Sequence, residues 1–345
     1  MSIDTIINRQ YAIANNEADS IALPKQKIYA MCNLRGGIGK TTLSFNLSYL
    51  VNDLLAIDTC PQGNLSYFYD NNYYASQQTN VKDMLLQYLV PGLGKATRVA
   101  AYIGATNQYF AENNNYYIPS SEELYLLPSQ LITAINQTSG LQQQQKEQAL
   151  KSILYSLKQE IERELGENGL DKCLIDTSPF FAGATQLAWY AADALIIPVR
   201  TDQQSIKSLE LLINTLSSPQ SEFRKYLPEN DMNVPKIQMV VLTHCGWSTV
   251  AGARNEPNQQ TKVYLNKVYD IISKHRTLLS TSNPENHLFM LDDFLGSGRI
   301  SSIESKPMAL LQEGETKVID RVRVSVNKSV DKCKNQLKFI AQQLW

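Results

Sequence analysis

The sequence lacks several features that would each indicate a particular class of protein. Its five cysteines are odd in number and never form a Cys-x-x-Cys pair. This pattern argues against a disulfide framework or a metal site and favours a reducing cytosol. No apolar stretch approaches the roughly 20 residues that cross a bilayer. The first residues also lack the charged start and apolar core of a secretory signal. We therefore expect a cytoplasmic protein.

Neither sign of charge is in excess. The 345 residues include 32 Lys and Arg against 33 Asp and Glu. The overall charge thus neither supports nor excludes a nucleic-acid partner, and only a local basic patch could provide one. The hydrophobic content of 43% is ordinary for a soluble globular protein. The length suits one large domain or two smaller ones.

Short apolar runs alternate with helical patterns along the chain, which predicts an α/β fold with a doubly wound, mostly parallel sheet flanked by helices. Residues 146–165 have apolar positions at helical spacing. Two stretches rich in Tyr, Asn and Gln, 66–79 and 104–117, are expected as surface loops, or alternatively as a docking surface for a protein partner. The predicted strands lie near 27–34, 54–59, 125–128, 172–177, 194–199, 237–244 and 287–293.

A glycine-rich segment directly follows the first predicted strand. Such a strand–turn–helix arrangement cradles phosphates, because the backbone N–H groups turn inward and the helix N-terminus favours negative charge. Lys40 is expected to reach the terminal phosphates, and the Thr41 hydroxyl to help hold Mg²⁺. The sequence therefore predicts a nucleoside triphosphate site. The cradle consists of Gly36, Gly37, Ile38, Gly39, Lys40, Thr41 and Thr42.

The basic residue ahead of this loop narrows the family. The segment resembles the deviant Walker A motif of the ParA/MinD superfamily, Lys-Gly-Gly-x-Gly-Lys-Thr-Thr, with Arg35 at the position of the leading lysine. In that family the lysine reaches the partner's phosphates across a nucleotide-sandwich dimer, so the resemblance implies the same role for Arg35. Arginine keeps the charge but is not equivalent to lysine. The alternative is that Arg35 positions the loop or pairs with a local carboxylate.

The end of the second predicted strand, Asp58-Thr59-Cys60-Pro61-Gln62-Gly63-Asn64, resembles the family's Asp-x-Asp-Pro-Gln-Gly-Asn segment. A carboxylate here lies beside the phosphate loop, so Asp58 is expected to act through the Mg²⁺ shell. Cys60 stands at the family's second aspartate, the residue tied to activating the attacking water. A neutral thiol is a poor substitute. We therefore expect slow intrinsic hydrolysis of ATP. A redox role for Cys60 is the alternative.

A third element, Ile175-Asp176-Thr177-Ser178-Pro179, has the Walker B pattern of an acidic residue ending an apolar strand, with Asp176 holding Mg²⁺ through water. Residues 125–129 resemble the family's strand ending in Leu-Pro-Ser. The segment 192–205, with Asp202 and Ser205, also looks like ParA, so the resemblance covers roughly residues 27–215. The adenine edge is expected around Thr243 and His244.

The segment at about 316–344 is expected as a basic amphipathic helix, because valines, leucines and isoleucines recur at helical spacing between lysines and arginines. One interpretation is a terminal helix docked on the sheet, with a solvated charged face. The other is a patch for nonspecific DNA. A membrane-binding tip, as in MinD, ranks below DNA. The expected DNA-binding residues are Arg321, Arg323, Lys328, Lys332, Lys334 and Lys338.

Together the motifs predict a ParA/Soj-like ATPase with a P-loop NTPase fold. The resemblance implies ATP and Mg²⁺ as cofactors, an ATP-bound homodimer, nonspecific DNA on the nucleoid, and a ParB-like or adaptor protein that stimulates hydrolysis. The cargo would be a plasmid, a chromosome region or a protein assembly. A MinD-like membrane ATPase and an ATP-dependent small-molecule ligase are the alternatives. We expect an N-terminal extension over residues 1–25 and one ATPase domain over 26–345.

Overall fold

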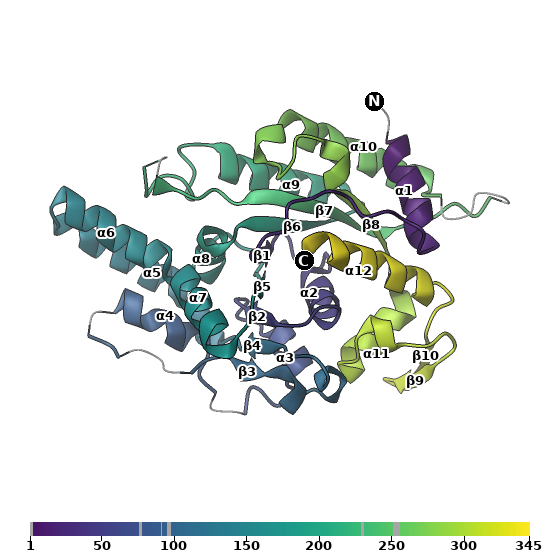
Figure 1. Ribbon diagram of the computed structural model, residues 1–345, viewed down its shortest axis with the longest axis horizontal. Helices are drawn as coiled ribbons and strands as arrows, with labels where there is room; N and C mark the ends of the chain where they lie inside the picture. Colours follow the sequence, from purple (N-terminus) through teal and green to yellow (C-terminus); the bar gives the residue numbers. More distant parts are fainter. Residues whose placement is uncertain (1–2, 76–77, 91, 95–97, 229–230, 251–255) are drawn as a thin grey trace.

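An eight-stranded sheet forms the centre of the molecule, with strand order β3-β4-β2-β5-β1-β6-β7-β8 (Figure 1). All neighbouring strands are parallel except β3, which pairs antiparallel with β4. The computed structural model describes residues 3–345 except 76–77, 91, 95–97, 229–230 and 251–255. The strands are β1 Ile28–Met31, β2 Leu54–Asp58, β3 Ala101–Tyr102, β4 Tyr116–Ile118, β5 Lys172–Asp176, β6 Ala194–Arg200, β7 Lys236–Cys245 and β8 Leu288–Asp292.

Helices cover both faces of this sheet, which explains why its central strands are continuous apolar runs. One core cluster joins the sheet to α4 Val81–Leu89, α5 Leu127–Gln137, α6 Gln143–Leu154, α7 Ser156–Asn168, α8 Ala184–Ala191, α9 Gln203–Ser217 and α10 Gln259–Lys274. The other joins it to α2 Lys40–Tyr49, α11 Leu295–Glu304 and α12 Val330–Leu344. The predicted doubly wound α/β fold is thus confirmed. No helix in the described ranges combines the length and apolarity that a membrane crossing requires.

The strand order reverses at β1, because β5 lies on one side of it and β6 on the other. In doubly wound sheets ligands bind in the crevice outside the carboxyl ends of the strands at such a reversal. The glycine-rich loop leaves β1 at this point and runs directly into α2. The topology therefore places the candidate site at the carboxyl ends of β1, β2 and β5.

The N-terminal helix α1, Asp4–Ala14, lies along the β8 edge of the sheet (Figure 1). Arg9 donates to the backbone oxygen of Leu288, and the Gln10 side chain donates to that of Met290 at 3.2 Å. Side chains thus occupy acceptors that an adjacent ninth strand would otherwise use. This matters because an open edge is a template for pairing with other chains. The domain boundary expected at residue 26 stays a prediction.

The predicted helix over 316–344 is wrong in its first half. Thr316–Ile319 forms β9 and Val322–Ser325 forms β10, an antiparallel hairpin outside the main sheet. The turn residues Asp320 and Arg321 both have positive φ, 48° and 67°, which ends any helix. Valines in this segment favour a strand, because their branched side chains suit a pleated surface. Only α12 remains helical, and it packs on the sheet as the docked interpretation expected.

The predicted strand at 125–128 is also wrong, whereas the other predicted strands are confirmed. Glu122–Tyr125 is a 3₁₀ turn, and α5 starts at Leu127 with a proline in its first turn. The strand that pairs with β2 on the side away from β5 is β4, which overlaps the end of the stretch 104–117 expected as a loop. Its Tyr117 joins Tyr69 of α3 Asn64–Tyr69 in an aromatic core cluster. The helical pattern at 146–165 belongs to α6 and α7.

Candidate functional site

The loop between β1 and α2 has the backbone geometry of an anion cradle. Gly37 and Gly39 have φ values of 70° and 90°, a region that residues with a side chain rarely adopt. The loop opens on a cavity of about 210 Å³, which all seven residues of the predicted cradle line. Cys60, Gln62, Asn64, Thr177 and Pro179 complete its wall. Three segments that are distant in sequence therefore meet at one small polar cavity.

Lys40 lies buried at the start of α2. Its amino group donates to the backbone oxygens of Asn33 and Arg35 at 3.3 and 2.9 Å. Burial lowers the pKa of Lys40, while the nearby carboxylate of Asp176 acts in the opposite direction. An ammonium group held by loop carbonyls beside the cavity can form much stronger charge-assisted bonds with an anion.

Asp176 ends β5 and faces the start of α2. The Thr41 hydroxyl donates to its Oδ2 at 2.7 Å, and the Ser44 hydroxyl donates to its Oδ1 at 2.9 Å. Asp58 is its register partner on β2 and accepts from the backbone N–H of Cys60 at 3.0 Å and of Ser66 at 2.9 Å. The residues predicted for Mg²⁺, Thr41, Asp58 and Asp176, thus come from three adjacent elements at one end of the sheet.

Two carboxyl groups are therefore buried side by side. Burial raises the pKa of both Asp58 and Asp176, and the charge of Asp176 raises that of Asp58 further. A divalent cation would relieve this unfavourable state, and oxygen donors such as these are what Mg²⁺ prefers. Among the described residues, no group of three or more His, Cys, Asp or Glu side chains could hold a metal.

Cys60 lies at the wall of the 210 Å³ cavity at the glycine-rich loop and is only 8% exposed. Burial, and then the charge of Asp58, raises the pKa of its thiol to about 12. The thiol is therefore neutral at physiological pH and cannot accept a proton from water. The same raised pKa disfavours the redox alternative, because the thiolate is the reactive form.

Arg35 has a partner within its own chain. Its guanidinium forms an ion pair with Asp202 and donates to the Ser205 hydroxyl at 2.7 Å. Asp202 is the N-cap of α9 and also accepts from the backbone N–H of Ser205. These contacts lower the pKa of Asp202. The local pairing that was one of the two interpretations for Arg35 is therefore present in the isolated chain.

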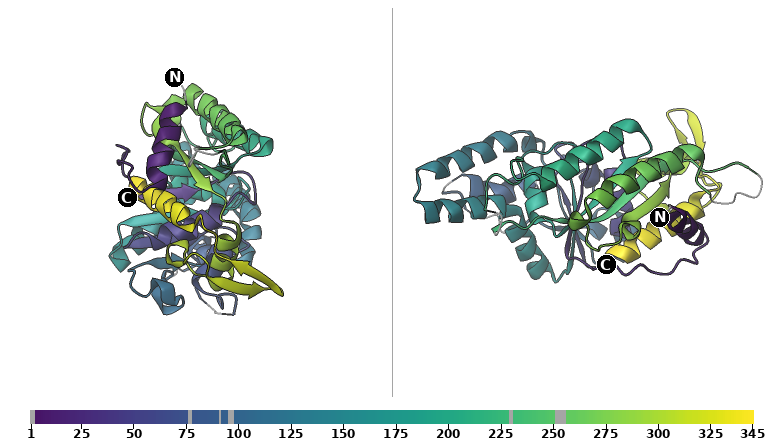
Figure 2. Two further views of the ribbon diagram at one scale, coloured as in Figure 1. Left: turned by 90° about the vertical axis from the view of Figure 1, so that its right-hand side faces the viewer. Right: turned by 90° about the horizontal axis from the view of Figure 1, so that it is seen from above.

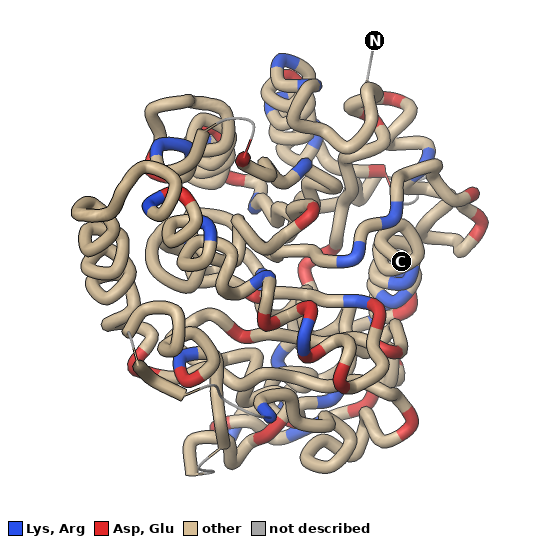
Figure 3. Tube along the Cα trace, turned by 60° about the vertical axis from the view of Figure 1, so that its left-hand side comes forward, with Lys and Arg blue, Asp and Glu red and all other residues tan. Residues whose placement is uncertain are grey.

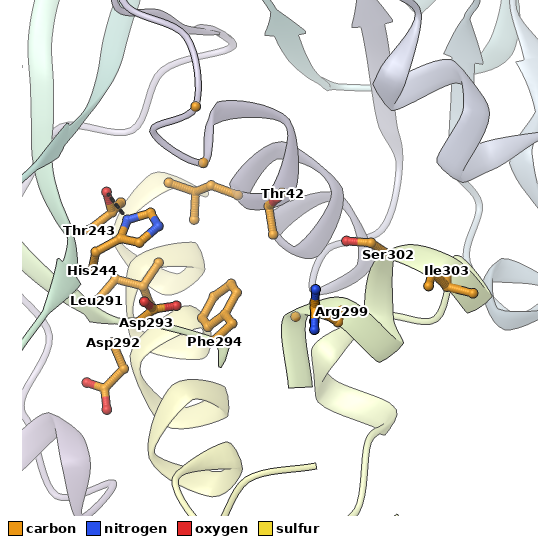
Figure 4. A pocket seen from close by; sticks show the side chains of 14 residues that line it. Thr42, Thr243, His244, Leu291, Asp292, Asp293, Phe294, Arg299, Ser302 and Ile303 are labelled. Atoms are coloured by element: carbon orange, nitrogen blue, oxygen red, sulfur yellow. Dashed lines mark hydrogen bonds between the residues drawn. The ribbon is translucent and has the colours of Figure 1, made fainter. Parts of the chain in front are cut away.

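A second cavity, of about 440 Å³, adjoins the other side of the glycine loop (Figure 4). Thr243 and His244, predicted near the adenine, line it at the end of β7. The Thr243 hydroxyl donates to the Ile38 backbone oxygen at 3.1 Å, which ties this wall to the cradle. Sequence reasoning missed the remaining lining outside α2 and the glycine loop. It consists of Leu291 and Asp292 at the end of β8, Asp293 and Phe294 directly after it, and Gly298, Arg299, Ser302 and Ile303 on α11.

The predicted DNA-binding residues do not share one helix face. Arg321 and Arg323 are exposed on the β9–β10 hairpin, Lys328 is exposed between hairpin and helix, and Lys338 is exposed on α12. Lys334 pairs with Asp331 at 2.9 Å. Basic and acidic positions are interspersed along the trace (Figure 3).

Lys332 is the exception among these residues, because it faces inward. Its amino group lies 3.3 Å from the Asp292 carboxylate and 3.1 Å from the ring centre of Trp247. Gln336 also donates to Asp292, at 2.8 Å. The arrangement makes Lys332 a packing residue rather than a surface cation.

Comparison with known proteins identifies relatives of this chain. A model of a family described as AAA domain matches residues 26–228. Sporulation initiation inhibitor protein Soj of Bacillus subtilis is 27% identical over 77% of this chain and 91% of its own length. Chromosome-partitioning ATPase Soj of Treponema pallidum is 28% identical over 56% of this chain and 65% of its own.

Solved structures share the fold. The ATP complex of a McdA variant from Cyanothece superposes with a TM-score of 0.59 at 16% identity, over 93% of this chain and 97% of its own. Apo McdA superposes with a TM-score of 0.55 at 19% identity, over 81% of this chain and 90% of its own.

Proposed function

The chain belongs to the AAA domain family as a ParA/Soj-like ATPase, and from this premise we propose that two copies enclose ATP and Mg²⁺, bind DNA without sequence preference and position a cargo. The cargo class is a plasmid, a chromosome region or a protein assembly. A ParB-like or adaptor protein would stimulate hydrolysis and so release the DNA. The γ-phosphate acts as the switch, since its contacts favour the dimer and their loss favours monomers.

One observation carries this proposal: Lys40 and Thr41 line the cavity at the strand reversal, the Thr41 hydroxyl donates to Asp176, and Asp58 is the register partner of Asp176 on β2. Lys40 is suited to bind the terminal phosphates once they replace the loop carbonyls. Thr41 and Asp176, with Asp58 behind them, would hold Mg²⁺. The bound ion would neutralise charge on the phosphate oxygens. The larger cavity beside Thr243 and His244 suits the nucleoside end of the same ligand.

Arg35 is proposed to join the two copies. In the isolated chain Asp202 holds the guanidinium, so a partner's phosphates must compete with this carboxylate. Phosphate oxygens suit the planar fork of arginine and carry more charge than a single carboxylate. Arg35 thus exchanges one anion for another when the dimer forms.

Replacing Arg35 by Ala is expected to weaken ATP-dependent dimerisation by at least about tenfold, since a desolvated charge pair is worth more than about 1.4 kcal/mol. Light scattering would measure the shift from 38.8 kDa to twice that mass. Arg276→Ala, on an exposed residue after α10, is the matched control. Unchanged dimerisation of Arg35→Ala would contradict the role in the partner's site.

The DNA surface is proposed to include the exposed cations Arg321, Arg323, Lys328 and Lys338, with Lys334 at its margin. The membrane alternative is weaker, because Phe339 and Leu344 of α12 are buried in the core and Trp345 packs edge-on against Tyr29 at 5.2 Å.

A gel-shift titration on random-sequence duplex DNA tests the proposed function. It is performed with ATP, with ADP and without nucleotide, at two salt concentrations. The expected result is binding with ATP alone that weakens steeply with salt, because counterions are released from the phosphates. Absence of binding in every state would contradict the DNA function and direct the next measurement to lipid co-sedimentation.

A further inference from the structure

The β9–β10 hairpin stands off the body of the molecule (Figure 2). Its two strands pair only with each other, with Val318 opposite Arg323 and Ile319 opposite Val322. Val318 is 69% exposed and Val322 is 57% exposed. Val324 and Val326, near the base, are buried in the core. Val318 and Val322 lie on opposite faces of the ribbon, because side chains alternate along a strand. The hairpin therefore has a fixed base, and its outer end carries one largely exposed valine on each face.

Cations surround this outer end. Arg321, Arg323 and Lys328 are exposed, and none of them forms a salt bridge within the described part of the chain. Arg323 only donates to the Thr316 hydroxyl, at 3.4 Å. The local carboxylates are mostly engaged elsewhere, because Glu304 pairs with Lys317 and Glu315 with Lys306. Asp320 in the turn and Glu313 before β9 remain.

The base of the hairpin is clamped to α11. The Asn327 side-chain oxygen accepts from the backbone N–H of Ser297 at 3.1 Å, and the Ser297 hydroxyl accepts from the Asn327 backbone N–H at 2.9 Å. Gly296 approaches the hairpin so closely that a Cβ there would lie 2.5 Å from the Ser325 backbone oxygen. The start of α11 and the base of the hairpin are therefore held together by direct contacts.

The same helix forms a wall of the larger cavity beside the glycine loop. Arg299, Ser302 and Ile303 line the cavity from α11, across from Thr243 and His244 (Figure 4). A ligand that fills this cavity would therefore contact α11 on one side. The hairpin is fixed to the N-terminal turn of the same helix. One 10-residue helix thus connects the cavity to the hairpin.

We propose that the β9–β10 hairpin is the element that enters a groove of duplex DNA, and that α11 makes this contact depend on the nucleotide in the adjoining cavity. The inference rests on the proposed function, which it deepens by naming the contacting element and its control. A two-stranded ribbon fits the major groove. Arg321 and Arg323 would meet phosphates on the groove walls, while Val318 and Val322 make apolar contacts that carry no sequence preference.

Two double variants separate the electrostatic and apolar parts of the contact. R321Q/R323Q should weaken DNA binding and lower the slope of log affinity against log salt by about 2, one for each lost phosphate contact. V318T/V322T keeps side-chain shape and strand preference, and should weaken binding roughly threefold to tenfold with an unchanged salt slope. K274Q/R276Q on and after α10, and V263T on α10, are the matched controls. Fluorescence anisotropy of a labelled random duplex with ATP gives both quantities.

The outcomes distinguish this inference from the function on which it rests. If wild type binds DNA with ATP and both double variants bind as tightly and with the same salt slope, the hairpin is not the DNA-contacting element. The proposed function would then still stand. No wild-type binding with any nucleotide would overturn both. Valine-dependent binding to phosphatidylserine vesicles in place of DNA would overturn duplex DNA as the occupant.

Variants of the Asn327–Ser297 contact test whether the nucleotide controls DNA binding through α11. N327A removes the acceptor for Ser297, whereas N327D retains an oxygen at that place. We expect N327A to reduce the ratio of DNA affinities with ATP and ADP by at least about tenfold, with ATP affinity itself unchanged in a fluorescent-nucleotide titration. N327D should restore most of the ratio. An unchanged ratio in N327A would overturn the coupling through α11.

Discussion

Cys60 lies at the wall of the cavity beside the glycine-rich loop as a neutral thiol, at the position where the resemblance to ParA implies a carboxylate. General-base assistance is typically worth about 10²–10⁴-fold in rate. We therefore expect Cys60→Asp to raise the steady-state rate of phosphate release by about tenfold or more at saturating Mg²⁺ and ATP. Cys60→Ser, neutral and of similar size, should leave the rate near that of wild type. No gain from the aspartate would mean that position 60 is not aligned with the attacking water.

The buried pair Asp58 and Asp176 predicts a pH dependence. Because their pKa values are raised, the folded chain holds protons that the unfolded chain has lost. Their contribution to the free energy of unfolding therefore decreases as pH rises from about 4 through the raised values. Mg²⁺ must displace those protons, so with ADP present its stabilising effect on the melting temperature should be larger at pH 8 than at pH 6. D176N should reduce that difference, because only the burial of Asp58 then remains to raise a carboxyl pKa in the pair. Equal Mg²⁺ effects at the two pH values in wild type would contradict the prediction.

At the scale of elements, α12 carries two kinds of lysine: Lys332 packs against Asp292 and Trp247, whereas Lys338 is exposed to solvent. Lys332→Gln should lower the free energy of unfolding by about 2–3 kcal/mol, because it leaves the Asp292 carboxylate buried without its cation. Lys338→Gln, on the exposed face of the same helix, should change stability by less than about 0.5 kcal/mol. Urea denaturation measures both. Comparable effects of the two substitutions would show that the Lys332–Asp292 contact contributes little.

The sheet edge closed by α1 leads to a further prediction at this scale. Deletion of residues 1–24 would leave the backbone oxygens of Leu288 and Met290 without the Arg9 and Gln10 donors and would uncover part of both core clusters, which contain Ile6 and Ile13 respectively. We expect a lower melting temperature and concentration-dependent association. Arg9→Ala is a milder version with the helix retained. A monomeric deletion variant with the wild-type melting temperature would contradict this role.

Local chemistry decides which elements could be predicted from the sequence. The central strands are long apolar runs buried on both faces, so their pattern is unambiguous. The run at 125–128 is equally apolar, but Pro128 suits the first turn of a helix and Tyr125 and Leu126 remain exposed. Strand β4 escaped prediction because tyrosines supply its apolar surface within an asparagine-rich stretch. In the hairpin, valines four residues apart imitate a helical period although the chain turns at Asp320.

At the scale of the whole molecule, the two halves of the site differed in predictability for a geometric reason. The phosphate cradle is continuous in sequence, and its acidic partners end strands whose order follows from the fold. The larger cavity joins the glycine loop to residues 243–303, more than 200 positions away, and its α11 wall carries no motif. Arg35 was assigned two roles from sequence, and only the folded chain could reveal Asp202 beside it.

The contact of α1 with β8 and α12 also has a consequence for the order in which the chain is made. Residues 4–14 leave the ribosome well before the partners of α1 are made. Leu288 and Met290 follow some 280 residues later, and Asn335, which donates to the Ala14 backbone oxygen at 3.0 Å, is made later still. At synthesis rates of about 5–20 residues per second, the first helix waits roughly 15–60 s for its partners. During that interval its apolar face is a natural ligand for chaperones.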